Sequence, residues 1–135
     1  MSKSWQPENA DQLLDAIKLA VTEGVSLNIR GQGSKQDFGR PTITSKILDI
    51  SGLKGITAYE PRELFMTANV ATTIAEIKSV LRQNNQHLAF EPPNMGVLYG
   101  VNKDSKDGGT IGGAIACNLA GPRRIQVGAA RDHFL

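Results

Sequence analysis

The chain has 135 residues, a length that suits a single domain. Its 40% apolar content supports a hydrophobic core, and 15 basic against 13 acidic residues leave a net charge of only +2. The charges are scattered, with no basic stripe or aromatic platform for nucleic acid. No apolar run approaches the roughly 20 residues of a membrane span, and no signal peptide is recognisable. With Cys117 as the one cysteine, no internal disulfide forms, which favours a reducing, cytoplasmic location.

The first third of the chain predicts one helix and two strands. Asn9 or Asp11 is expected to cap the helix, and Gly24 to end it. Alternating apolar residues over 25–29 predict a strand, and 46–50 predict a second short one. The apolar face of the helix consists of Leu13, Leu14, Ile17, Ala20 and Val21.

The middle of the chain predicts a hairpin followed by a helix. Residues 56–59 and 64–70 have strand composition and are separated by a short polar turn containing a proline. Thr73 and Glu76 match a capping box, so a second helix is expected to open there and to stop at Asn84. Its buried stripe is expected to be Ile74, Ile77, Val80 and Leu81.

The last third is more irregular. Residues 88–90 predict a short extended piece, and the two prolines within 91–94 impose a rigid, non-helical turn. Residues 96–107 are polar and predict an irregular loop, whereas the small apolar residues of 110–119 predict a short helix. Residues 131–135 resemble a strand that breaks off, which predicts that the domain is incomplete at its C-terminus.

The segment from Arg30 to Lys35, Arg-Gly-Gln-Gly-Ser-Lys, is the first candidate site. Two glycines one residue apart permit positive φ angles, and successive N–H groups in such a turn can form a concave anion site. Ser34 adds a hydroxyl, and Arg30 and Lys35 add positive charge. The segment is not a Rossmann fingerprint, because Gln36 stands where the third glycine would be, and the chain has no P-loop.

A second glycine-rich segment, Gly108-Gly109-Thr110-Ile111-Gly112-Gly113, comes much later in the chain. It leads into the short helix predicted over 110–119, whose N-terminus would favour an anion or the polar edge of a ring. Two such segments in one small chain favour a ligand with two phosphates, or with a phosphate and a flat ring system.

Other chemistry-bearing residues have structural interpretations. His87 is expected on the surface, and His133 is expected to pair with the preceding aspartate. Cys117 is expected to be a buried, inert thiol, and its spacing from the histidines predicts no metal site. Arg123 and Arg124 either cap the preceding helix or contact a phosphate or a partner. The carboxylates show no pairing suited to acid–base catalysis, so no catalytic residue is predicted.

Several motifs occur together in a fixed order. They are Arg30-Gly31-Gln32-Gly33-Ser34-Lys35, Phe90-Glu91-Pro92-Pro93, Gly109-Thr110-Ile111-Gly112-Gly113, Leu119-Ala120-Gly121-Pro122-Arg123-Arg124 and Arg131-Asp132-His133-Phe134-Leu135. This set resembles the FAD-binding domain of the vanillyl-alcohol-oxidase/PCMH flavoproteins, and among them the FAD-binding subunits of bacterial glycolate oxidases. The resemblance implies that residues 1–135 are the N-terminal part of an α+β domain, with a small mixed sheet flanked by helices.

The resemblance also implies a binding site for FAD. The first glycine-rich loop would wrap the pyrophosphate, while the proline turn and the second segment approach the flavin. Relatives that bind FAD covalently carry histidine at the position of Ser34, so the binding implied here is non-covalent. The implied cofactor-binding residues are Arg30, Gly31, Gln32, Gly33, Ser34, Lys35, Pro92, Gly108, Gly109, Thr110, Gly112, Gly113 and Gly121.

By the same resemblance, the protein would take part in oxidising 2-hydroxy acids such as glycolate. Relatives transfer a hydride to the flavin, supply substrate-handling groups from later parts of the chain, and pass electrons to an iron–sulfur subunit. The implied location is the cytoplasm, with attachment to the inner membrane through partner subunits as an option. Two alternatives stay open. One is a free-standing nucleotide-binding or partner-docking module without catalysis, and the other is a cell-wall-precursor reductase on the same fold.

Overall fold

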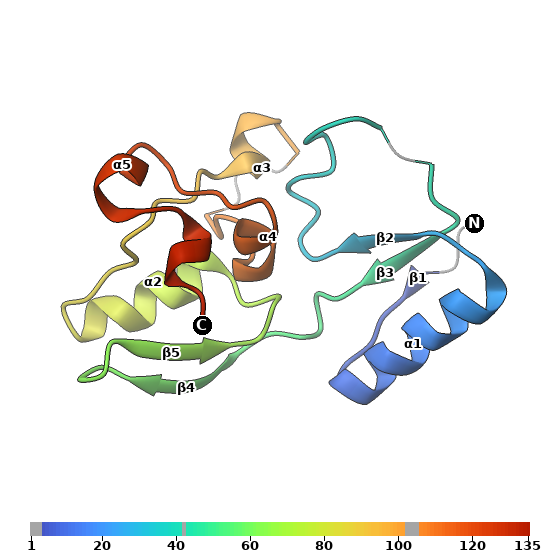
Figure 1. Cartoon of the computed structure of the whole chain (residues 1–135), viewed down its shortest axis with the longest axis horizontal. Helices are drawn as coiled ribbons and strands as arrows, with labels where there is room; N and C mark the ends of the chain where they lie inside the picture. Colours follow the sequence, from blue (N-terminus) through green and yellow to red (C-terminus); the bar gives the residue numbers. More distant parts are fainter. Residues whose placement is uncertain (1–3, 42, 102–105) are drawn as a thin grey trace.

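The computed structural model describes residues 4–41, 43–101 and 106–135 and has an α+β fold made of two halves (Figure 1). The first half contains β1 (Ser4–Trp5), α1 (Ala10–Glu23), β2 (Leu27–Arg30) and β3 (Lys46–Asp49). The second contains β4 (Ile56–Glu60), β5 (Phe65–Ala68), α2 (Ile74–Gln83), α3 (Met95–Leu98), α4 (Ile111–Ala116), α5 (Arg124–Val127) and the 3₁₀ helix η1 (Ala130–His133). The predicted fold class is confirmed, with the strands divided between two small sheets.

The sheet of the first half is parallel, with the strand order β1-β3-β2. Arg30 pairs with Asp49, so both strands end at the same edge and the first glycine-rich loop leaves from there. Leu48 on the central strand is 1% exposed and is the main buried side chain of this sheet. The two-residue strand β1 has no counterpart in the sequence prediction, because so short an element leaves no periodic signal.

Helix α1 begins and ends where the sequence predicts. Asn9 caps it by accepting a hydrogen bond from the N–H of Gln12 at 2.9 Å, and Gly24 ends it in the left-handed region. The predicted apolar stripe, in contrast, is mostly exposed, since among the helix residues only Ala20 is buried. The physical reason is that α1 lies along a sheet of two- to four-residue strands, which offers little surface to cover a whole helix face (Figure 1).

The second half is built on the predicted hairpin and the predicted second helix. Strands β4 and β5 are antiparallel, and two hydrogen bonds fasten them to the end of α2: Tyr59 donates to Gln86 at 2.6 Å, and Gln86 donates to the Pro61 carbonyl at 2.7 Å. Thr73 accepts from the N–H of Glu76, the first bond of the expected capping box. Buried side chains of α2 are Ile74, Ile77 and Leu81, while Val80 is half-buried.

Two expectations for the last third were wrong. The segment predicted as an irregular loop over 96–107 begins with the short helix α3, although residues 102–105 lie outside the described part. The segment predicted as a strand over 131–135 starts instead with η1. Asp132 holds that turn by accepting a hydrogen bond from the N–H of Ala129 at 2.7 Å, and no described strand lies beside it to form a ladder.

Candidate functional site: two glycine-rich segments in contact

The first loop (residues 30–35) and the second segment (residues 108–113) meet at the junction of the two halves. A Cβ atom placed on Gly31 would lie 3.3 Å from Cγ2 of Thr110. One placed on Gly109 would lie 3.2 Å from the Ser34 hydroxyl. Gln32 of the first loop donates to Asp107, the residue just before the second segment, at 2.9 Å and across 75 residues of sequence. The two segments therefore lie in contact, although they are far apart in the sequence.

The first loop presents a run of main-chain donors. Within the described residues, the N–H groups of 31–35 donate to no protein acceptor. The turn is closed further on, where Gln36 N–H donates to the Gly33 carbonyl and Phe38 N–H donates to the Lys35 carbonyl. Gly33 has φ 71°, a left-handed conformation that other residues resist. Successive N–H groups left without partners in such a turn are a favourable site for an anion.

The second segment contributes fewer donors than the sequence suggested. Thr110 caps α4 by accepting from Gly113 N–H at 3.3 Å, and Gly112 N–H donates to the Val70 carbonyl at 2.9 Å. Ile111 N–H donates to the Thr72 carbonyl. These three amides already have acceptors, so the start of α4 is tied to the core. The N–H groups of 108–110 have no protein acceptor among the described residues.

Lys35 is the cation that the two segments enclose. Its side chain is half-buried, and Nζ lies 3.1 Å from Cβ positions built on Gly109 and on Gly113. Burial lowers the pKa of Lys35, and the neighbouring Cys117 offsets this in part. No ion pair recorded in the described part of the chain includes Lys35. Cys117 is half-buried, so the expectation of a fully buried thiol was wrong.

Arg30 is engaged with protein neighbours. With the Gln36 amide oriented so that its oxygen faces the guanidinium, Gln36 accepts hydrogen bonds from Arg30. Arg30 also acts on Asp49. Burial would raise the pKa of that carboxyl, but hydrogen bonds from Ser51 and Gln6 and the charge of Arg30 outweigh it and hold the pKa below its usual value. In this arrangement Arg30 stabilises the C-terminal end of β2. Lys35 is the loop cation that forms no ion pair within the described residues.

Two of the predicted cofactor-binding residues take part in packing elsewhere. Gly121 has φ 74°, and a Cβ there would collide with the Glu91 carbonyl oxygen. Glu91 N–H donates to the Ala120 carbonyl at 2.8 Å, so the glycine lets these two segments run in contact. Pro92 is buried in the same region. Their roles toward a cofactor stay predictions, whereas their structural role is evident.

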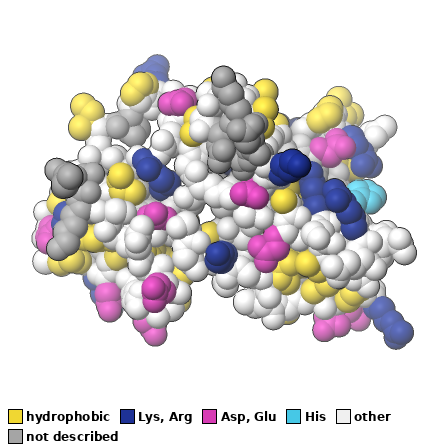
Figure 2. Space-filling view, turned by 180° about the vertical axis from the view of Figure 1, so that it is seen from behind, with side chains coloured by type: hydrophobic (Ala, Val, Ile, Leu, Met, Phe, Trp, Pro, Cys, Tyr) yellow, Lys and Arg dark blue, Asp and Glu magenta, His cyan; other side chains and the backbone are white. Residues whose placement is uncertain are grey.

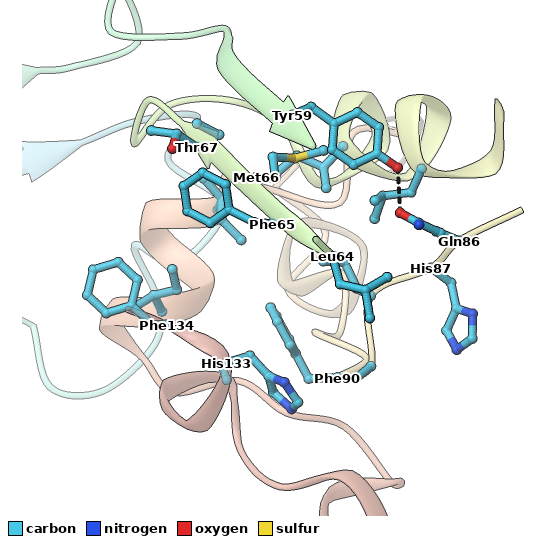
Figure 3. Close-up of a pocket in the computed structure, with 18 of the residues that line it drawn as sticks. Tyr59, Leu64, Phe65, Met66, Thr67, Gln86, His87, Phe90, His133 and Phe134 are labelled. Atoms are coloured by element: carbon cyan, nitrogen blue, oxygen red, sulfur yellow. Dashed lines mark hydrogen bonds between the residues drawn. The ribbon is translucent and has the colours of Figure 1, made fainter. Parts of the chain in front are cut away.

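A groove of about 700 Å³ lies on another side of α4 (Figure 3). We call it the apolar groove. Ile111, Gly112 and Ile115 line it from α4, whereas Gly113 of the same helix faces Lys35. The remaining lining comes largely from β5, the end of α2 and the C-terminal residues. A diphosphate needs hydrogen-bond donors and positive charge, so the contact between the glycine-rich segments is the better candidate for it.

The donor set fits a dinucleotide diphosphate. Two groups of main-chain N–H, 31–35 and 108–110, lie beside one half-buried ammonium and the Ser34 hydroxyl. A diphosphate offers several anionic oxygens, which both charge and oriented amides stabilise. The exposed or half-buried state of the first loop leaves it open to a ligand. In the part of the chain that the structure describes, no group of three His, Cys, Asp or Glu side chains could hold a metal ion.

The sequence matches the FAD binding domain family over residues 4–135, nearly its whole length. The chain therefore belongs to this family, and FAD is the cofactor of the fold. It is 38% identical over 123 residues to the glycolate oxidase subunit GlcE of Escherichia coli (strain K12). That alignment covers 91% of the chain but 32% of the relative, so the chain spans about a third of the curated protein's length.

Solved structures support the fold assignment. An alkyldihydroxyacetonephosphate synthase superposes with a TM-score of 0.69 at 15% identity, over 96% of this chain and 23% of that one. Aclacinomycin oxidoreductase superposes with a TM-score of 0.63 at 18% identity, over 96% of this chain and 24% of that one. At such identities the likeness concerns the fold alone. In the described residues, no helix combines the length and the apolar character needed to cross a membrane.

Sequence reasoning missed three features of this region. The Gln32–Asp107 hydrogen bond had no signal, because it joins residues in two irregular segments. Lys35 lies near Cys117 because of where α4 packs, and the spacing of the two residues in the sequence gives no sign of it. The apolar groove could have been suspected from the apolar residues of β5, among which Phe65 is 41% exposed.

Proposed function

We propose that this chain is the FAD-holding part of a flavin-dependent oxidoreductase that oxidises a 2-hydroxy acid of the glycolate type. The observation that carries the proposal is the contact between the two glycine-rich segments, with their partnerless amides around Lys35. The identity to a glycolate oxidase subunit supports the substrate class. When bound, FAD supplies hydride acceptance, and the protein's task is to hold and orient the cofactor.

The residues divide this task. Gly31, Gln32 and Gly33 would donate main-chain N–H groups to the diphosphate, Ser34 would add its hydroxyl, and Lys35 would neutralise charge. The binding is proposed to be non-covalent, because serine cannot form the bond that a histidine forms with flavin. Acid precipitation of the FAD-loaded protein tests this: yellow colour in the supernatant supports it, and colour retained in the pellet contradicts it.

The decisive experiment for cofactor binding is spectroscopic. Purified protein titrated with FAD should turn yellow and quench free-flavin fluorescence, and the melting temperature should rise with FAD concentration. A protein that leaves FAD fluorescence unchanged but is stabilised by ATP or ADP would support a simple nucleotide-binding module instead. No catalytic residue is proposed among these residues, so glycolate- or D-lactate-dependent dye reduction by the 135-residue chain should be close to background.

The proposal includes partner subunits. GlcE is by name a subunit of glycolate oxidase. We propose that this chain works in an assembly of the same kind, with an iron–sulfur subunit as the electron acceptor, in the cytoplasm or at the inner membrane through its partners. Co-expression with candidate subunits, followed by size-exclusion chromatography and iron analysis of the co-eluting fraction, tests this assembly.

A further inference from the structure

A second hollow, of about 230 Å³, lies beside the C-terminal end of α2. Three cations from two distant parts of the chain line it: Lys78 and Arg82 on α2, and Arg123 just before α5. Leu88 and Phe90 supply apolar lining, and Glu91 adds one carboxylate. We call this site the basic hollow. Figure 2 shows Lys and Arg side chains gathered beside a histidine on the face turned away from the view in Figure 1.

The cations of the basic hollow lack ion-pair partners. The ion pairs of the described residues are Lys46 with Glu23 and Arg131 with Asp132, and neither involves the hollow. The dipole of α2 explains the presence of Arg82 in its last turn. It does not explain why Arg123, far from α2 in the sequence, lines the same hollow. The hollow therefore holds three cations against one carboxylate, Glu91, and none of the three cations forms an ion pair within the described residues.

The walls of the hollow are held in place by internal contacts. Gln86 is fixed by hydrogen bonds to Tyr59 and Pro61, as Figure 3 shows for the first of these. Phe90 is 5% exposed, and its ring stacks on His133 with centroids 5.7 Å apart. Walls that are ordered before binding lose little entropy when a ligand arrives. The apolar groove adjoins this site, because both are lined by Gln86, Phe90 and the two residues after Gln86.

We propose that the basic hollow is a docking site for an acidic segment of a partner protein, with carboxylates on the arginines and an apolar side chain against Leu88. Its volume of 230 Å³ equals the liquid volume of about eight waters, more than one small ion needs. Carboxylates and inorganic phosphate both match the fork of donors on each guanidinium. Only a peptide can also place an apolar side chain against Leu88 and Phe90, where an inorganic anion gains nothing. The lining of the basic hollow includes no residue of the two glycine-rich segments, 30–35 and 108–113.

The probe is a fluorescein-labelled peptide of sequence Glu-Asp-Leu-Glu-Asp-Leu, followed by anisotropy as the full chain is titrated up to millimolar concentration. The charge-free peptide Gln-Asn-Leu-Gln-Asn-Leu is the ligand control. The test variant combines Arg82→Gln with Arg123→Gln. The matched control combines Arg62→Gln with Lys54→Gln, two exposed cations that line neither hollow. Circular dichroism and FAD titration of each variant establish folding and cofactor binding separately.

The expected result is binding of the acidic peptide by the wild type and the control variant, and a loss of about tenfold or more in the Arg82/Arg123 variant. Raising NaCl from about 50 to about 300 mM should weaken the wild-type complex. The difference in peptide affinity between the wild type and the Arg82/Arg123 variant should then become smaller. FAD affinity should be the same in all three proteins. Failure of FAD binding in all of them would instead overturn the proposed function and leave the peptide result standing.

Four outcomes of the peptide titrations would overturn the docking proposal. Two concern the wild type: no binding of the acidic peptide up to millimolar protein, and equal affinity for the acidic and the charge-free peptide. The third is that the control substitutions weaken peptide binding as much as the Arg82/Arg123 substitutions do. The fourth is displacement of the acidic peptide by sodium phosphate at the same concentration as the peptide. The last would make the hollow a general anion site. Preference of the hollow for phosphatidylcholine vesicles containing phosphatidylglycerol over the peptide would also refute the proposal, in favour of a membrane surface.

Discussion

Replacing Lys35 by methionine separates the cost of burying this cation from its benefit to cofactor binding. Methionine keeps an aliphatic stem beside Gly113, where Cε of Lys35 lies 3.6 Å from the Cβ position built on that glycine, but it removes the charge. Because burial lowers the pKa of Lys35, the ammonium is less stable in the fold than in the unfolded chain. The Lys35→Met variant without FAD should therefore be as stable as the wild type or more stable, by urea denaturation at pH 7.

The same substitution should weaken FAD binding. A hydrogen bond to a charged group contributes about 1.5–3 kcal/mol. Since about 1.4 kcal/mol is a tenfold change in Kd, we expect the Kd for FAD to rise by about 10- to 150-fold. Fluorescence quenching or isothermal titration calorimetry measures this. Lys54→Met is the matched control, because Lys54 is exposed and lies outside both glycine-rich segments, and it should change neither property.

The pH dependence has a defined sign. Below the lowered folded-state pKa, Lys35 is protonated in both states and its burial cost is fully present. As pH rises through that pKa toward the unfolded value of 10.5, the folded protein loses its proton first, and the wild type gains stability relative to the Met variant. A Met variant that is clearly destabilised without FAD, or that binds FAD as tightly as the wild type, would refute this account of Lys35.

Three further changes test other parts of the structure. Gly109→Ala should lower stability and weaken FAD binding, because the position has φ 81° and its new Cβ would lie 3.1–3.2 Å from Lys35 and Ser34. Gly24→Ala is the control: with φ 62° and open space around it, it should show only the backbone strain of about 1 kcal/mol. Tyr59→Phe removes the part-buried hydrogen bond to Gln86 and should cost about 1 kcal/mol in urea denaturation without affecting FAD, and an unchanged midpoint would show that water replaces the bond. Asp49 has a lowered pKa, so its stabilising effect is present above the unfolded value of 3.8 and is lost as pH falls through the folded value. Asp49→Asn should remove that part of the loss of stability in acid. A pH profile of stability identical to that of the wild type would contradict the lowered pKa.

Local chemistry made several elements predictable from sequence. The caps Asn9 and Thr73 and the stop at Gly24 depend on groups within a few residues, so the ends of α1 and the start of α2 were correct. The hairpin of β4 and β5 was correct for the same reason, since a short polar turn brings alternating strands together. The motif order also identified the family, which the match over residues 4–135 confirms.

What the sequence determined by itself was thus the set of local elements, the two glycine-rich segments and the family. Only the tertiary structure decided which of their donors are left for a ligand. Gly112 and Gly113 look like cofactor-facing residues in the sequence, but their N–H groups are paired with Val70 and Thr110 once α4 packs. Lys35 becomes a half-buried cation because segments distant in the sequence cover one side of it. Such properties depend on contacts between residues far apart in the chain, and no local pattern encodes them.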